Sequence, residues 1–148
     1  MTGAAGAAGG TLAAGSRATF RHKLTEAHTV PRLLPEAASF AAMPGVLATG
    51  TMVGLMEWAC IEHLAPHLGD GQGSLGTHVD VSHVAATPPG LTLEIETEVL
   101  SVEGRSVWFR VRAHDGVDMI GEGRHRRAIV EWDRFVPRAM AKAERAGE

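Results

Sequence analysis

A chain of 148 residues, of which 45% are hydrophobic, is long enough to bury the core of one domain. Its net charge of −3, from 14 basic and 17 acidic side chains, excludes a general affinity for nucleic acid or for anionic membranes. The only cysteine in the sequence, Cys60, cannot form an internal disulfide and favours a reducing compartment, so we expect a cytoplasmic protein.

The first sixteen residues, MTGAAGAAGGTLAAGS, carry no charged side chain and consist almost entirely of alanine and glycine. This composition predicts a flexible tail at residues 1–16, followed by one domain at residues 17–148. The tail lacks the basic start and the apolar centre of a signal peptide. Residues 37–56 are uncharged, but one proline and three glycines interrupt them, which favours a buried segment over a membrane span.

The stretch TGTMVGLMEWACIEHL, from Thr49 to Leu64, predicts a helix that is apolar on nearly every side and must therefore be covered all round. Glu57 stands in its middle, and none of its neighbours on the helix surface can pair with a charge. Unless a partner from elsewhere pairs with it, burial would raise its pKa from about 4.3 toward the ~6–7 range of acid–base catalysts. The structural alternative is a carboxylate that reaches solvent or meets an arginine.

Four segments after this helix alternate with a period of two residues and are joined by short turns, which predicts antiparallel strands. The first runs from Leu75 to Ala85 and would place His83 on its apolar face, where a lone histidine is usually a hydrogen-bonded core residue. The others cover residues 91–99, 106–114 and about 119–132, and residues 18–25 could add one more. The pattern predicts an α+β fold with a sheet curled around the helix, part of whose cover could come from a partner subunit.

Several other motifs are weaker indications. Thr49 or Thr51 could cap the helix, whose N-terminus also offers free N–H groups to an oxyanion. The segment GQGSLG has the spacing of a dinucleotide motif but precedes a strand, so we reject a nucleotide site there.

The remaining motifs concern histidine, cysteine and arginine. Pro66 separates His63 from His67, which argues against a zinc site. Cys60 lies near Glu57 on the helix, but a buried thiol is usually inert packing. The run RHRR, residues 124–127, is a solvated strand end by default, although its alternate members would point to one side and could meet phosphates.

Five blocks, ATGTMVGLMEWAC, GQGSLGT, HVAATPPGLT, SVEGR and AHDGVDMIGEG, lie in one order between Thr19 and Phe135. In these long blocks the chain resembles the fluoroacetyl-CoA thioesterases of the hotdog-fold superfamily. The resemblance implies a homodimer in which each antiparallel sheet wraps a central hydrophobic helix and acyl-CoA lies near the subunit interface. It implies no cofactor and no metal, and neither nucleic acid nor membrane as a partner.

The resemblance also assigns site residues. The family's catalytic threonine, glutamate and histidine correspond to Thr49, Glu57 and His83. Gly76 corresponds to a glycine that approaches the thioester, and Arg127 to a basic residue associated with substrate or CoA contacts. Glu57 would either attack the carbonyl or activate water, Thr49 would orient Glu57 or donate to the developing charge, and His83 would be the acid–base partner.

One position departs from the family. The family's lid over the acyl group uses aromatic side chains ahead of the threonine, and Phe40 matches one of them while Met43 stands at the other. Methionine fills space flexibly and offers no fixed ring. From the resemblance as a whole we expect a fluoroacetyl-CoA thioesterase with a detoxifying role. The alternatives are a short-chain acyl-CoA thioesterase that prefers acetyl or aromatic acyl groups, and a non-catalytic dimer that binds acyl-CoA.

Overall fold

The computed structural model of the protein describes residues 12–147. Most of the expected tail, residues 1–11, lies outside the described residues. Its last part contacts the domain, since Leu12 packs against the core and Ser16 shares a hydrogen bond of 2.9 Å with His63.

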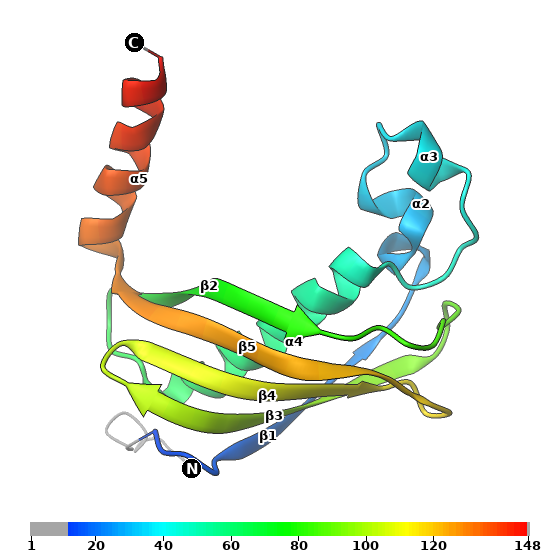
Figure 1. Cartoon of the computed structure of the whole chain (residues 1–148), viewed down its shortest axis with the longest axis horizontal. Coiled ribbons are helices and arrows are strands. Elements are labelled where there is room, and N and C mark those ends of the chain that lie inside the picture. The colour runs from blue at the N-terminus through cyan, green and yellow to red at the C-terminus, as the bar shows by residue number, and fades with distance from the viewer. Residues whose placement is uncertain (1–11, 148) are drawn as a thin grey trace.

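One antiparallel sheet of five strands curls around a long helix (Figure 1), which confirms the predicted α+β hotdog architecture. The strands lie in the order β1-β3-β4-β5-β2. Their bounds are Arg17–Lys23 for β1, Gln72–Val81 for β2, Thr92–Glu103 for β3, Ser106–His114 for β4 and Met119–Glu131 for β5. The central helix, α4, spans Thr49–Leu64 as predicted.

Short helices connect β1 to α4. They are the 3-10 helix η1 (Glu26–His28) and the helices α2 (Val30–Leu33) and α3 (Ala38–Ala41). A second 3-10 helix, η2 (Ala65–His67), ends α4 at a proline. In Figure 1, α2 and α3 extend beyond the β2 edge of the sheet, close to the N-terminus of α4.

The predicted alternation of the central strands is confirmed. In β4 the side chains of Val107, Phe109, Val111 and Ala113 are fully buried, whereas the residues between them face outward. In β3 the buried positions include Leu93, Ile95 and Val99. These residues pack onto one side of α4, which contributes Met52, Leu55, Met56, Ala59, Cys60 and Leu64 to the same core.

The other side of α4 is open in the single chain. Trp58 is 43% exposed and Ile61 is 40% exposed, although both are large apolar residues in the middle of the helix. The all-round cover that the sequence requires is therefore incomplete among residues 12–147.

The edge strand β2 differs from its prediction. It ends at Val81, so His83 lies in the extended segment after the strand and not on an apolar strand face. A bulge between Gly76 and His78 shifts the register against β5. Because one extra residue reverses the side-chain alternation, the period-two reading from Leu75 onward fails, and Val79 is 47% exposed.

The sequence reading missed a C-terminal helix, α5 (Trp132–Ala146), which follows β5 directly. Apolar residues spaced by three and four positions indicate this helix, but Pro137, inside it, is a helix-breaking signal. The Trp132 ring lies over Gly73 of β2, where even a Cβ atom would clash with it. This contact fixes the base of α5 to the start of β2, and the rest of α5 stands away from the sheet (Figure 1).

Candidate active site

Thr49 and His83 form the first half of the site. Thr49 is the first residue of α4, and its Oγ1 shares a hydrogen bond of 2.7 Å with His83 Nδ1. The N-cap residue is Ala48, and no side chain caps the helix, so the capping role considered for Thr49 is wrong. The hydroxyl is held by the imidazole instead.

The second nitrogen of His83 is available for chemistry. Nε2 is buried and has no hydrogen-bond partner among the described residues. Desolvation by burial lowers the pKa of His83 below its ordinary value, so the ring is neutral at neutral pH and can accept a proton. The pair lies in a pocket whose further lining includes Val30, Leu47 and Val84.

Glu57 and Arg127 form the second half. Arg127 Nη1 lies 3.0 Å from Glu57 Oε2, and the exposed fractions of the two side chains are 3% for Arg127 and 40% for Glu57. Of the two readings of Glu57, the structure supports the carboxylate that meets an arginine and reaches solvent, and the dry, unpaired carboxylate is wrong. The partner comes from β5 and could not be read from the helix alone. The hydrogen bond that Arg127 donates to Glu57 goes to Oε2, and Glu57 lines a surface pocket.

Arg127 is held by residues of two strands. Its Nε donates to Ser74 Oγ at 2.8 Å and its Nη2 to the Ser74 carbonyl at 2.9 Å. His125 Nδ1 donates to the His78 carbonyl at 2.8 Å, so its Nε2 is left to accept from Arg127 Nη1 at 3.1 Å. Burial, and secondarily the Arg127 charge, lowers the pKa of His125, which keeps this ring a neutral acceptor. The guanidinium is thus locked in place beneath Glu57.

Gly76 makes room for the carboxylate. A Cβ atom at this position would lie 2.7 Å from Glu57 Oε2 and 3.0 Å from His125 Cε1. A real Cβ does not approach an oxygen so closely, so only glycine lets Glu57 lie against the β2 backbone. Glu57 and Gly76 line a surface pocket together with Val53, Thr77, His78, Val79 and His125.

The two halves are separate within one chain. Thr49 and Glu57 are eight residues apart on α4, which corresponds to about 12 Å along a helix. No hydrogen bond joins Glu57 to Thr49 or His83 within residues 12–147, and the two pairs line different pockets.

The predicted lid residues belong to the segment ahead of α4, but neither of them lines the pocket of Thr49 and His83. Phe40 is in α3 and Met43 follows it, and the Met43 side chain is 48% exposed. The segment that carries them leads into α4 through Leu47, which lines the Thr49–His83 pocket.

Sequence reasoning missed Ser74 and His125. The signal for His125 was available, because the RHRR run is a strand whose alternate members share a face. His125 and Arg127 indeed point inward, while the guanidinium groups of Arg124 and Arg126 lie 4.9 and 5.1 Å from the centre of the Trp108 ring. Ser74 carried no distinguishing signal in the sequence.

The other candidates have structural roles. Burial raises the pKa of Cys60 to about 12, which makes it an inert thiol. His63 Nδ1 shares a hydrogen bond of 2.7 Å with Thr97 Oγ1, inside the core. Within residues 12–147, no three His, Cys, Asp or Glu side chains are placed to hold a metal ion, and no helix is long and apolar enough to cross a membrane.

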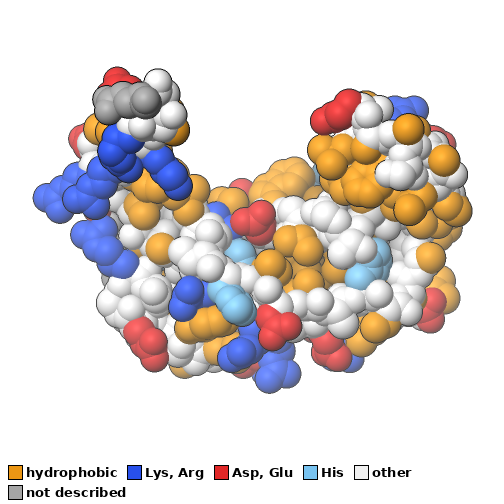
Figure 2. All heavy atoms as spheres, turned by 45° about the horizontal axis from the view of Figure 1, so that its top comes forward, with side chains coloured by type: hydrophobic (Ala, Val, Ile, Leu, Met, Phe, Trp, Pro, Cys, Tyr) orange, Lys and Arg blue, Asp and Glu red, His pale blue; other side chains and the backbone are white. Residues whose placement is uncertain are grey.

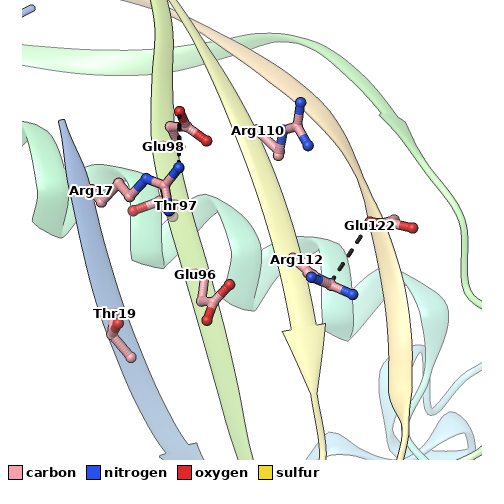
Figure 3. A pocket seen from close by; sticks show the side chains of 8 residues that line it. All are labelled: Arg17, Thr19, Glu96, Thr97, Glu98, Arg110, Arg112 and Glu122. Atoms are coloured by element: carbon pink, nitrogen blue, oxygen red, sulfur yellow. Dashed lines mark ion pairs between the residues drawn. The ribbon is translucent and has the colours of Figure 1, made fainter. Parts of the chain in front are cut away.

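A groove on the outer face of the sheet is unrelated to this site. Figure 3 shows that its charged side chains project from β1, β3, β4 and β5 on the side of the sheet away from α4. Ion pairs join Arg17 to Glu98 at 3.7 Å and Arg112 to Glu122 at 3.8 Å. Exposed pairs of this kind are typical of a solvated sheet face.

Comparison with known proteins agrees with this geometry. The family described as fluoroacetyl-CoA-specific thioesterase matches residues 24–133. A fluoroacetyl-CoA thioesterase from Streptantibioticus cattleyicolor is 51% identical over 128 residues, which cover 86% of this chain and 92% of that protein.

Solved structures give the same result. A structure of the fluoroacetyl-CoA thioesterase FlK has a TM-score of 0.88 at 49% identity and covers 90% of this chain and 98% of that one. A variant of FlK in complex with fluoroacetate and CoA has a TM-score of 0.82 at 52% identity, with 84% of this chain and 99% of that chain covered. The chain belongs to the family of fluoroacetyl-CoA-specific thioesterases.

Proposed function

We propose that this protein hydrolyses fluoroacetyl-CoA to fluoroacetate and CoA, in a detoxifying role. The observation that carries the proposal is the Glu57 carboxylate, which buried Arg127 holds against the Gly76 backbone at a surface pocket. A carboxylate fixed in this way can act on a carbonyl carbon placed in the pocket. Membership of the thioesterase family and the FlK variant complex with fluoroacetate and CoA support the choice of substrate.

We further propose that the working unit is a homodimer paired along β2. This strand of ten residues is an edge of the sheet, and Val53 and Glu57 of α4 line an open pocket beside it. An unpaired edge of this length is a template for pairing with another strand. A second copy would cover both surfaces at once.

The dimer would also unite the two halves of the site. If two β2 strands pair antiparallel about a two-fold axis near Val79 and Asp80, the strand segment at Gly76 lies opposite His83 of the partner subunit. Each composite site would then contain Glu57 and Gly76 from one chain, with Thr49 and His83 from the other. This arrangement resolves the separation of about 12 Å along α4.

Each residue then has a role. Arg127 orients Glu57 through Oε2, and Oε1 either attacks the thioester carbonyl or removes a proton from the attacking water. If Oε1 attacks, a carbon–oxygen bond forms, the carbon–sulfur bond breaks and a mixed anhydride results; water then cleaves the anhydride and gives its proton to His83 Nε2, which passes it to the thiolate. If Oε1 instead takes a proton from water, the hydroxide forms the new bond to the carbonyl carbon, the carbon–sulfur bond breaks, and the proton passes from Glu57 by way of His83 Nε2 to the thiolate. In both routes the Thr49 hydroxyl, fixed by Nδ1, stabilises the oxyanion. We propose that Arg127 acts through Glu57 and not by direct contact with CoA, because its side chain is only 3% exposed.

The test is thiol release from fluoroacetyl-CoA and acetyl-CoA, followed with a disulfide dye. Cys60 is buried with a pKa of about 12, so the native protein should add little background to the signal. Far faster turnover of the fluorinated ester is the expected result. Saturable binding of both esters without thiol release would instead support the non-catalytic acyl-CoA-binding dimer.

Met43 supports a second candidate, a short-chain acyl-CoA thioesterase with relaxed acyl preference. An exposed, flexible side chain at this lid position gives the acyl group no rigid wall. Hydrophobic contacts of this size change discrimination by about 1–3 kcal/mol. Comparable kcat/KM for the acetyl and fluoroacetyl esters, with discrimination increased in Met43→Phe, would favour this candidate.

Two sequence readings complete the proposal. A single buried thiol fits a reducing compartment, so we place the protein in the cytoplasm. No bound cofactor is required, because the proton transfers and the charge stabilisation above use side chains only.

A further inference from the structure

The helix α5 has an apolar stripe that is largely uncovered in the described chain beyond its first residue, Trp132, whose ring lies over Gly73. Trp132, Phe135, Val136 and Met140 recur at spacings of three and four residues, and their exposed fractions are 37, 36, 47 and 61%. No residue of α5 is buried. A long one-sided apolar face on a helix that stands away from its own sheet indicates a docking surface.

A second uncovered apolar surface lies at the other end of β2. We define the lid segment as residues 26–43, which contain η1, α2, α3 and the two lid positions Phe40 and Met43. Leu34 is 47% exposed and Met43 is 48% exposed. Figure 2 shows the molecule as two raised lobes with a hollow between them, and hydrophobic side chains lie on both lobes.

Within one chain these two surfaces are too far apart to meet. The base of α5 is joined to the chain just before β2, where the backbone N–H of Trp132 donates to the Gly71 carbonyl at 2.9 Å. The lid segment stands near His83, just beyond the end of β2. The ten residues of β2 between them span about 33 Å.

A second copy of the chain brings the two surfaces together. Antiparallel pairing along β2 places the start of one strand beside the end of the other. With the axis near Val79 and Asp80, Gly73 and the Trp132 ring above it lie opposite Ala86 of the partner subunit. Since α5 and the lid segment both extend past the β2 edge (Figure 1), α5 would rise directly beside the partner's lid segment.

The charges of the two surfaces are complementary. The α5 helix has four basic residues, Arg134, Arg138, Lys142 and Arg145, against two acidic ones, Asp133 and Glu144. The lid segment has two acidic residues, Glu26 and Glu36, against Arg32. Opposite net charge favours this pairing over the approach of two α5 helices to one another.

We propose that the apolar stripe of α5 packs against the partner subunit's lid segment and holds that lid over the acyl group of the partner's site. This inference rests on the proposed β2 dimer and extends it, because the lid is then incomplete without the second chain. The α5 helix of one chain would pack against the lid segment that carries Phe40 and Met43 in the other chain. This contact would restrict the motion of the flexible Met43 side chain.

Cross-linking tests the contact directly. In a Cys60→Ser background, a chain with Met140→Cys and a differently tagged chain with Leu34→Cys are co-expressed and treated with a short bismaleimide linker. We expect a product that joins unlike chains. Arg138→Cys, on the side of α5 opposite Met140, is the matched control and should cross-link at least ten times more slowly. Equal yields from both positions, or none from Met140→Cys, would overturn the proposal.

A second readout follows the lid itself. In Met140→Ser, amide hydrogen exchange in residues 33–43 should become at least tenfold faster than in the wild type, while Arg138→Ser, on the opposite side of α5, leaves it unchanged. Sedimentation measures whether the variant still forms a dimer, and thiol release measures whether it is still an active thioesterase. These two measurements distinguish a failure of the dimer or of the proposed function from a failure of α5 to contact the lid segment. The inference would be contradicted if Met140→Ser remained a stable dimer and amide exchange in residues 33–43 stayed at the wild-type rate. Binding to phosphatidylglycerol vesicles that depends on Met140, without the cross-link, would also contradict it and assign α5 to a membrane surface.

Discussion

Arg127 lies buried against Glu57, with its Nη1 3.0 Å from the carboxylate Oε2 and its Nε and Nη2 donating to Ser74. The arginine therefore fixes the position of the carboxylate. This relationship is the reason why we propose Glu57 as the carboxylate that acts on a bound thioester.

The Glu57 carboxylate can be removed without removing its contact. Glu57→Gln should lower kcat about 100-fold or more, because an amide neither attacks the carbonyl nor accepts the proton of water. Its carbonyl oxygen can still accept from Arg127, so the melting temperature should fall only slightly. Glu62→Gln, exposed on the same helix, is the control and should match the wild type. Unchanged kcat in Glu57→Gln would remove Glu57 from the mechanism.

Arg127→Met tests the support of that carboxylate. The change leaves Ser74 and Glu57 without their partner, and we expect a loss of about 1–3 kcal/mol in the free energy of unfolding. This is less than the ~3–5 kcal/mol of a fully buried pair, because the Glu57 side chain is 40% exposed and screened by solvent. Chemical denaturation measures the loss, and Arg126→Met, at the outward-facing neighbour, should cost much less. Equal losses would mean that burial of Arg127 adds nothing.

Gly76→Ala should displace the carboxylate. The new Cβ would lie 2.7 Å from Glu57 Oε2, so the side chain must move away from the pocket wall. We expect kcat to fall by at least tenfold with a smaller change in KM. Gly69→Ala is the comparison, since its Cβ would be 3.6 Å from the nearest atom, an ordinary contact. A Gly76→Ala enzyme with wild-type kcat would show that the position of Oε2 is not critical.

The pH dependence of activity should report His83. Burial lowers the pKa of His83, and only the neutral ring can take up a proton, so kcat/KM should be constant above about pH 7 and fall at lower pH. The midpoint of the fall should lie below about 6.5. A midpoint above about 6.5 would contradict a buried neutral His83.

The hydroxyl of Thr49 can be tested by two substitutions. Thr49→Ser should keep this pH profile and Thr49→Val should lose most activity, because only serine retains the hydroxyl.

The stability of the fold should depend on His63 in the same direction. Desolvation lowers the pKa of His63 in the folded state, so protonation favours unfolding. The stability associated with the neutral ring is complete above the unfolded pKa of about 6.5 and is lost as the pH falls through the folded value. His63→Gln can still bond Ser16 and Thr97 but cannot be protonated. Urea unfolding at several pH values should show a shallower dependence for this variant, and an unchanged slope would exclude His63 as a contributor.

The sequence predicted the fold well where hydrophobic periodicity is strong. The helix from Thr49 to Leu64 and the alternating strands β3 and β4 follow directly from side-chain spacing. The prediction failed at β2, because the bulge after Gly76 reverses the side-chain alternation and the strand ends at Val81, before His83. It also missed α5, where Pro137 concealed an amphipathic pattern.

The site was predictable in part. The resemblance supplied Thr49, Glu57 and His83 as one group, and the structure joins only Thr49 to His83 within a chain. The Arg127 partner of Glu57 comes from a strand seventy residues away, and no helical wheel reveals such a contact. Pairing across a sheet depends on register, which a sequence pattern specifies only where no bulge intervenes.

The two edges of the sheet have different fates. The β1 edge is short and carries Arg17, Arg21 and Lys23, of which Arg17 and Arg21 form ion pairs with β3. Charged, short edges resist the addition of another strand. In the proposed dimer, pairing of two β2 edges would use up the one receptive sheet edge that residues 12–147 provide on each copy. Growth of the sheet would then stop at two chains, and the same pairing would keep the protein from forming fibres.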